Sequence, residues 1–186
     1  MRITKMILIF VIACLVSLPA IAQAQKGNKE TELKTQEQPN TEILHFKDWV
    51  VRCENPEDTE DKSCFLFQRV ALNSGQTVLS VTVAYPQTSE EAAAVFRLPL
   101  GIFLPAGAVI QVDKNEPIKL VVQRCDQKGC WAPLKLDTTT LTLLKKGHEA
   151  KVGFNNTGGK IIAVPLSLKG FTSGFKEITK KNRATR

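Results

Sequence analysis

Four cysteines downstream of residue 24 constrain this chain more than any other feature. They form two close pairs in the sequence, and each pair lies near one of the two tryptophans. Four cysteines allow three connectivities, and spacing alone does not choose among them. Each close pair flanks turn-rich residues between two predicted strands, so a local bridge closes a hairpin. We therefore favour the disulfides Cys53–Cys64 and Cys125–Cys130.

Two other uses of the cysteines stay open at this point. Four thiolates can hold zinc in a tetrahedral cage, although structural zinc sites usually space paired cysteines by two to four residues. A redox enzyme using Cys125 and Cys130 is the second alternative, although the chain has no C-x-x-C motif. Structural disulfides persist in oxidising compartments. This pattern predicts a protein of the periplasm or cell envelope, with surface display or secretion as further outcomes.

The first 24 residues have the layout of a secretory signal peptide. Arg2 and Lys5 precede an apolar run over 6–18, and Ala22-Gln23-Ala24 follows as a cleavage pattern. We expect cleavage between Ala24 and Gln25, with an uncleaved inner-membrane anchor as the alternative.

Composition divides the remainder into three parts. Residues 25–41 are rich in polar side chains and predict a flexible leader. A β domain is expected over 42–178 and a basic tail over 179–186. The whole chain carries a net charge of +7, but the signal peptide and the stretch 176–186 hold nearly all of it. Because the domain is close to neutral, we expect no nucleic-acid partner.

Alternation of apolar and polar residues dominates the domain and predicts strands with one buried face. In 161–168, for example, Ile162, Val164, Leu166 and Leu168 form the inward set. Strands are expected at 47–53, 64–72, 78–85, 94–100, 108–113, 118–124, 130–136, 149–155 and 161–168. Pro165 predicts an edge position or a bulge. This spacing indicates an antiparallel sandwich or barrel.

Two short helices are predicted among these strands. Asp137 is the expected N-cap of a helix that ends at Gly147. A second helix of one or two turns is expected over 172–180.

Two segments are candidate contact surfaces. The first cysteine loop carries an acidic cluster, and a solvated loop is the plain alternative; its members are Glu54, Glu57, Asp58, Glu60 and Asp61. The stretch 98–110 has no charged residue, and its centre, Ile102, Phe103 and Leu104, is a candidate apolar tip for a partner or a membrane. Burial of these residues as strand ends joined by a turn is the alternative.

The sequence offers little for catalysis. His45 and His148 are the two histidines, and neither has the spacing of a metal-ligand motif. No nucleophile elbow or phosphate-binding loop is present. We therefore expect a protein that is not an enzyme and that uses no cofactor and no metal.

Several short motifs together resemble the invasion-associated locus B (IalB) family of exported bacterial proteins. The residues that carry the resemblance are Asp48-Trp49-x-Val51-x-Cys53 with Cys64, Leu98-Pro-Leu-Gly101-Ile-x-Leu-Pro105-x-Gly107, Arg124-Cys125 with Gly129-Cys130, and Val164-Pro-Leu-Ser-Leu-x-Gly170-Phe171. They occur in the family's order over about 46–178. The leader, the acidic loop and the tail lie outside the resemblance.

The resemblance implies an all-β fold, an immunoglobulin-like antiparallel β-sandwich, and a virulence role in host-cell entry, with erythrocytes among the hosts. It brings no catalytic residues. One hypothesis is a binding protein that promotes invasion through an unknown host-cell protein or membrane surface. The other is a periplasmic envelope-maintenance or chaperone-like protein that affects invasion indirectly through an envelope partner.

Overall fold

The computed structural model describes residues 41–55 and 63–184, and within them the strands form two antiparallel sheets. The larger sheet has seven strands in the order β1-β2-β3-β4-β5-β9-β8. Their bounds are β1 Glu42–Phe46, β2 Trp49–Glu54, β3 Ser63–Ala71, β4 Thr77–Ala84, β5 Ala93–Leu98, β8 Arg124–Asp126 and β9 Gly129–Lys135. Each strand pairs antiparallel with its neighbours.

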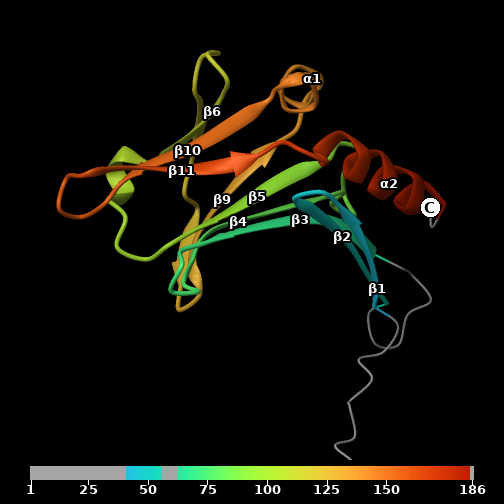
Figure 1. The fold of residues 1–186 in the computed structure, drawn as a ribbon, viewed down its shortest axis with the longest axis horizontal. Helices are drawn as coiled ribbons and strands as arrows, with labels where there is room; N and C mark the ends of the chain where they lie inside the picture. The colour runs from blue at the N-terminus through green and yellow to red at the C-terminus, as the bar shows by residue number, and fades with distance from the viewer. Residues whose placement is uncertain (1–40, 56–62, 185–186) are drawn as a thin grey trace, which may run out of the picture. The chain divides into compact units, whose positions relative to one another are not determined.

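The smaller sheet has four strands in the order β11-β10-β6-β7. Their bounds are β6 Ala108–Val112, β7 Ile118–Leu120, β10 Glu149–Asn155 and β11 Ile161–Ser167. One face of this sheet packs on the larger sheet, and both contribute to one hydrophobic core (Figure 1). The fold is an immunoglobulin-like β-sandwich, as predicted.

The alternation in the sequence correctly predicts which side chains face the core. In β4, Leu79, Val81 and Val83 are buried, and in β11 so are Val164 and Leu166. β11 is an edge strand, which explains how it accommodates Pro165 without loss of a ladder hydrogen bond.

The strand expected over 118–124 is wrong as a single element. β7 ends at Leu120 in the smaller sheet, whereas Arg124 begins β8 in the larger one. Val121 and Val122 continue the apolar pattern across this change of sheet, so periodicity alone hides it. β1 was not predicted, because its apolar residues follow a polar leader and lie on a half-covered edge of the sheet.

The first helix, α1 Thr138–Lys146, forms where expected. The Asp137 carboxylate accepts a hydrogen bond from the backbone N–H of Thr140 at 2.7 Å, and Gly147 is the C-cap. This N–H, reinforced by the hydroxyl of the same residue, holds the pKa of Asp137 below its ordinary value.

The second helix, α2 Phe171–Ala184, is longer than the predicted 172–180. It covers the inner face of β1, β2 and β3 with the buried side chains of Phe171, Phe175 and Ile178 (Figure 1). Its approach is close enough that a Cβ on Gly174 would lie 2.4 Å from Leu66 Cδ1. Among the described residues no helix is both long and apolar enough to cross a membrane.

A polar seam joins the two sheets where β11 ends against β3. The buried Gln68 side chain accepts a hydrogen bond from the Ser167 backbone N–H at 3.0 Å. Its Nε2 donates to the Ser167 carbonyl at 3.1 Å and to the Asp48 carbonyl at 3.0 Å. The Ser167 carbonyl also accepts from Trp49 Nε1 at 2.8 Å. These bonds satisfy edge groups of β11 that have no strand partner.

The motif that begins at Asp48-Trp49 and the motif Val164–Phe171 are far apart in the chain and meet at this seam. Trp49 also packs edge-on against Phe171, with ring centroids 5.2 Å apart. Gly170 has a φ of +93°, and a Cβ there would lie 1.8 Å from the Phe46 carbonyl oxygen. This position requires glycine for both reasons.

Candidate binding surfaces

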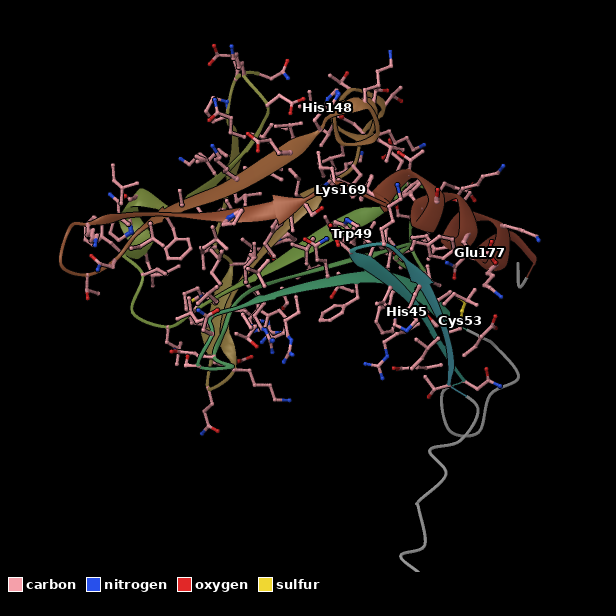
Figure 2. All side chains as sticks on the ribbon, in the orientation of Figure 1. His45, Trp49, Cys53, His148, Lys169 and Glu177 are labelled. Atoms are coloured by element: carbon pink, nitrogen blue, oxygen red, sulfur yellow. A yellow bond between two sulfur atoms is a disulfide. The ribbon has the colours of Figure 1, made fainter. Side chains whose placement is uncertain are left out.

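The structure pairs the cysteines as predicted, Cys53 with Cys64 and Cys125 with Cys130. In each disulfide the two residues lie directly opposite each other on adjacent strands, with Cα atoms 4.0 Å apart. The β2–β3 disulfide is buried, and Figure 2 shows Cys53 on its strand near α2. The β8–β9 disulfide closes a hairpin at the sheet edge, with Cys125 exposed.

The acidic cluster is described only in part. Glu54 is exposed at the end of β2, and its carboxylate lies 3.5 Å from Arg52 Nη2. Glu57, Asp58, Glu60 and Asp61 lie outside the described residues. The expected cleavage site, Ala24/Gln25, lies outside them as well.

The two histidines are not brought together. Figure 2 shows His45 on β1 and His148 beside α1, well apart. His148 Nδ1 lies 3.8 Å from Asp113, whose carboxylate accepts backbone N–H bonds from Glu149 and His148. These bonds, led by the one from Glu149, hold the pKa of Asp113 below its ordinary value. Over 41–55 and 63–184 the structure contains no group of three His, Cys, Asp or Glu side chains suited to a metal ion.

The apolar tip divides between the core and the surface. Ile102 forms a bridge with Asn156 and turns inward, with 6% of its surface exposed. Phe103 and Leu104 remain 48% and 52% exposed, and a short 3-10 helix, Leu104–Ala106, follows them. Leu100 in the same loop is also exposed. The alternation of the bridge sends one apolar side chain into the core and the next outward.

The smaller sheet extends this exposed surface. Phe103 donates its backbone N–H to the Asn155 carbonyl at 2.7 Å, and Ile161 pairs with Asn155 from the other side. Phe103 and Ile161 therefore lie on either side of Asn155 on the outer face of the sheet. Val109 lies on the same face, opposite Gly153 in the adjacent row. We call Leu100, Phe103, Leu104, Val109 and Ile161 the apolar patch.

The sequence did not reveal the members of this patch beyond its tip. Ile161 is 74% exposed, although it opens a strand whose alternate residues are buried. Its outward position follows from the same alternation that turns the half-buried Ile162 inward, but its closeness to Phe103 depends on the Ile102 bridge. That contact joins two loops separated by more than fifty residues, so no local pattern reports it.

Lysines surround the apolar patch. Lys119 lies directly opposite Val109 in the β6–β7 pair, and Lys160 precedes Ile161 in the chain. Lys151 occupies the next outward position of β10 and has Glu149 at 3.8 Å as an ion-pair partner. All three side chains are exposed. The arrangement suits an amphiphilic surface with negative charge, because apolar contact and cationic groups lie on one face.

Comparison with known proteins places the chain among invasion-associated proteins. The model of the family "Invasion associated locus B (IalB) protein" matches residues 49–179. Two invasion protein B homologs of Brucella abortus, from strain 2308 and from biovar 1 strain 9-941, are each 27% identical over 173 residues, covering 92% of both chains. The crystal structure of invasion associated protein B from Bartonella henselae aligns with a TM-score of 0.69 at 18% identity. It covers 77% of this chain and 99% of that one, which shows a shared fold. The chain is therefore a member of the invasion-associated locus B family.

Proposed function

We propose that this protein is an exported, non-catalytic binding protein that promotes host-cell invasion, and that the apolar patch is its contact surface. The names of the Brucella relatives support the link to invasion. Two disulfides support an oxidising compartment outside the cytoplasm. The observation that carries the proposal is a cluster of large apolar side chains left exposed on a folded domain. Erythrocytes are among the host cells to be tested.

The size of the patch predicts a weak single contact. Fully burying a Leu, Ile or Phe side chain contributes about 1.5–3 kcal/mol. Because Phe103, Leu104 and Ile161 are already partly covered, burying the rest contributes on the order of 3–6 kcal/mol together. Loss of translational and rotational freedom offsets much of that. Firm attachment would therefore need many copies acting on one surface.

The test is complementation of a deletion strain with Phe103→Ser/Ile161→Ser. We expect this variant to restore less host-cell entry than the unmodified protein. Leu72→Ser is the matched control, because Leu72 is 52% exposed in the β3–β4 turn outside the patch. Protease treatment of intact bacteria must also digest a surface pool of the protein. Normal entry with the double variant, or the lack of any surface pool, contradicts direct binding.

Indirect action through the bacterial envelope is the second candidate. The lysines around the patch favour it equally, since anionic lipids of the bacterium's own membranes attract such a surface. In that case a deletion strain becomes sensitive to detergent or acid before it meets any host cell. Phe103→Ser/Ile161→Ser fails to restore this resistance, and Leu72→Ser restores it. An intact barrier in the deletion strain counts against the envelope role.

A further inference from the structure

We propose that the outer face of the seven-stranded sheet binds an anionic polysaccharide through three arginines, Arg69, Arg97 and Arg124, which we call the arginine row. This site lies on the larger sheet, whereas the apolar patch lies on the smaller one. The inference does not depend on the proposed role in invasion.

Strand register aligns the arginine row. Arg69 on β3 pairs with Ser80 on β4, and Ser80 pairs with Arg97 on β5. Arg97 pairs with Trp131 on β9, which pairs with Arg124 on β8. Residues directly opposite each other share a face, so all five side chains project from the same side. Because neighbouring strands lie about 4.8 Å apart, successive arginines stand about 10 Å apart across the sheet.

Neighbouring side chains hold two of these arginines in place. Arg97 Nε donates to the buried Ser80 hydroxyl at 3.1 Å, and its guanidinium carbon lies 5.9 Å from the Trp131 ring centroid. The Arg124 guanidinium carbon lies 4.8 Å from that centroid. Asp126 Oδ2 accepts hydrogen bonds from Arg124 Nη1 at 2.6 Å and from Trp131 Nε1 at 2.8 Å. Restricting these side chains lowers the entropy that binding must remove.

The donors that remain can bind anions. The Nη groups of Arg97 and the whole guanidinium of Arg69 have no acceptor among the residues that the structure describes. A guanidinium presents paired donors that match carboxylate, sulfate or phosphate oxygens in bidentate geometry. The β8–β9 disulfide positions this end of the row, because it closes the hairpin that carries both Arg124 and Trp131.

The charge around the row stays positive. Among the residues that the structure describes, Asp126 is the carboxylate in contact with the row, and it neutralises part of Arg124. The backbone N–H of Lys128, followed by Trp131 and Arg124, lowers the pKa of Asp126, so this group remains ionised. Lys128 itself adds an exposed cation at the hairpin turn.

The form of this surface favours an extended polymer. Figure 1 shows no other described element on the face of β3, β4 and β5 that is turned away from β10 and β11. The next row on that face has half-buried apolar side chains, among them Phe67, Val95 and Pro133, which offer contact to sugar rings. An open sheet face with cations at regular spacing matches a chain that carries acid groups at its own repeat. A small anion would meet only one arginine at a time.

Binding of heparin, a sulfated polysaccharide, to the full mature chain tests the inference, with neutral dextran as the uncharged probe. We expect Arg69→Gln/Arg97→Gln/Arg124→Gln to weaken heparin binding by about tenfold or more at physiological salt. Arg97→Lys keeps the charge but loses the paired donors, so we expect a smaller loss. Retained disulfides and an unchanged circular dichroism spectrum establish that each variant is folded.

The matched control removes three charges elsewhere. Lys145, Lys176 and Lys180 line a groove between α1 and α2, and Lys145→Gln/Lys176→Gln/Lys180→Gln should leave heparin binding within about threefold. An equal loss in this control means that overall charge decides binding, which overturns the site. Competition by polyglutamate or single-stranded DNA as strong as by heparin overturns the polysaccharide assignment. Phe103→Ser/Ile161→Ser should bind heparin normally, so failure here and failure of the invasion proposal are distinguishable.

Discussion

Replacing Gln68 with methionine tests the polar seam between the two sheets. Methionine has nearly the same length and volume but makes no comparable hydrogen bonds. The change removes all three bonds of the Gln68 side chain, those with the Ser167 N–H, the Ser167 carbonyl and the Asp48 carbonyl. The Ser167 carbonyl keeps its bond from Trp49 Nε1. The Ser167 N–H and the Asp48 carbonyl lose these partners; Ser167 is half-buried, whereas Asp48 is exposed.

The expected cost follows from those two groups. Each buried polar group left unsatisfied costs about 1–3 kcal/mol. Water can reach the carbonyl of the exposed Asp48, and methionine recovers part of the loss through its apolar surface, so the free energy of unfolding should fall by about 1–3 kcal/mol. With an m-value of about 2 kcal/mol/M, the urea midpoint should fall by about 0.5–1.5 M at unchanged slope. Far-ultraviolet circular dichroism of the oxidised protein follows the transition, because this signal also reports on variants that lack Trp49.

Two further variants make the reasoning refutable. Gln111→Met removes one exposed bond to the Asn115 carbonyl, so we expect a change below about 0.5 kcal/mol. Gln68 and Trp49 both donate to the Ser167 carbonyl. Gln68→Met combined with Trp49→Phe should therefore cost about 1 kcal/mol more than the sum of the single changes. A loss for Gln68→Met no larger than for Gln111→Met refutes the seam as a stabilising feature.

Three other predictions concern the fold. Gly170→Ala should lower the free energy of unfolding in a urea titration by about 3 kcal/mol or more, because the new Cβ would clash with the Phe46 carbonyl oxygen. Gly75 also has a positive φ but has open space around it, so Gly75→Ala should cost about 1–2 kcal/mol in the same titration. As reductant is increased stepwise, the β8–β9 disulfide should be reduced before the β2–β3 disulfide, because Cys125 is exposed whereas Cys53 and Cys64 are buried. Alkylation of the freed thiols followed by mass spectrometry reads the order, and the reverse order contradicts the prediction. The lowered pKa of Asp137 contributes stability that is complete above about pH 4 and is lost as pH falls through the folded pKa. The thermal midpoints of the unmodified protein and Asp137→Asn should therefore approach each other as pH falls below about 4.

The sequence predicted well those features that depend on neighbours along the chain. Alternation in β4 and β11 identified their buried faces, and Asp137 with Gly147 identified both ends of α1. Local turns also favoured the correct cysteine pairs. Each of these follows from backbone periodicity or from capping over a few residues.

Features that depend on register between distant strands could not be predicted. Arg69, Arg97 and Arg124 share a row only because four strand pairings set the alignment of five strands. Ile102 belongs to an apolar run that gave no reason to separate it from Phe103, and the bridge to Asn156 decides which of them is buried. A one-residue slip would exchange their places. The side chains that gather on one surface are therefore set by strand pairing, which the pattern of a single sequence does not reveal.

Both disulfides join cysteines that are consecutive along the chain, whereas the core is completed by its last helix. A chain that emerges from its amino end can form each bridge before the next pair appears, so the correct pairing needs no shuffling. The inner face of β1, β2 and β3 stays uncovered until α2 arrives. Truncation before Phe171 should therefore leave a correctly oxidised chain that aggregates. For this protein, correct oxidation reports little about whether folding is finished.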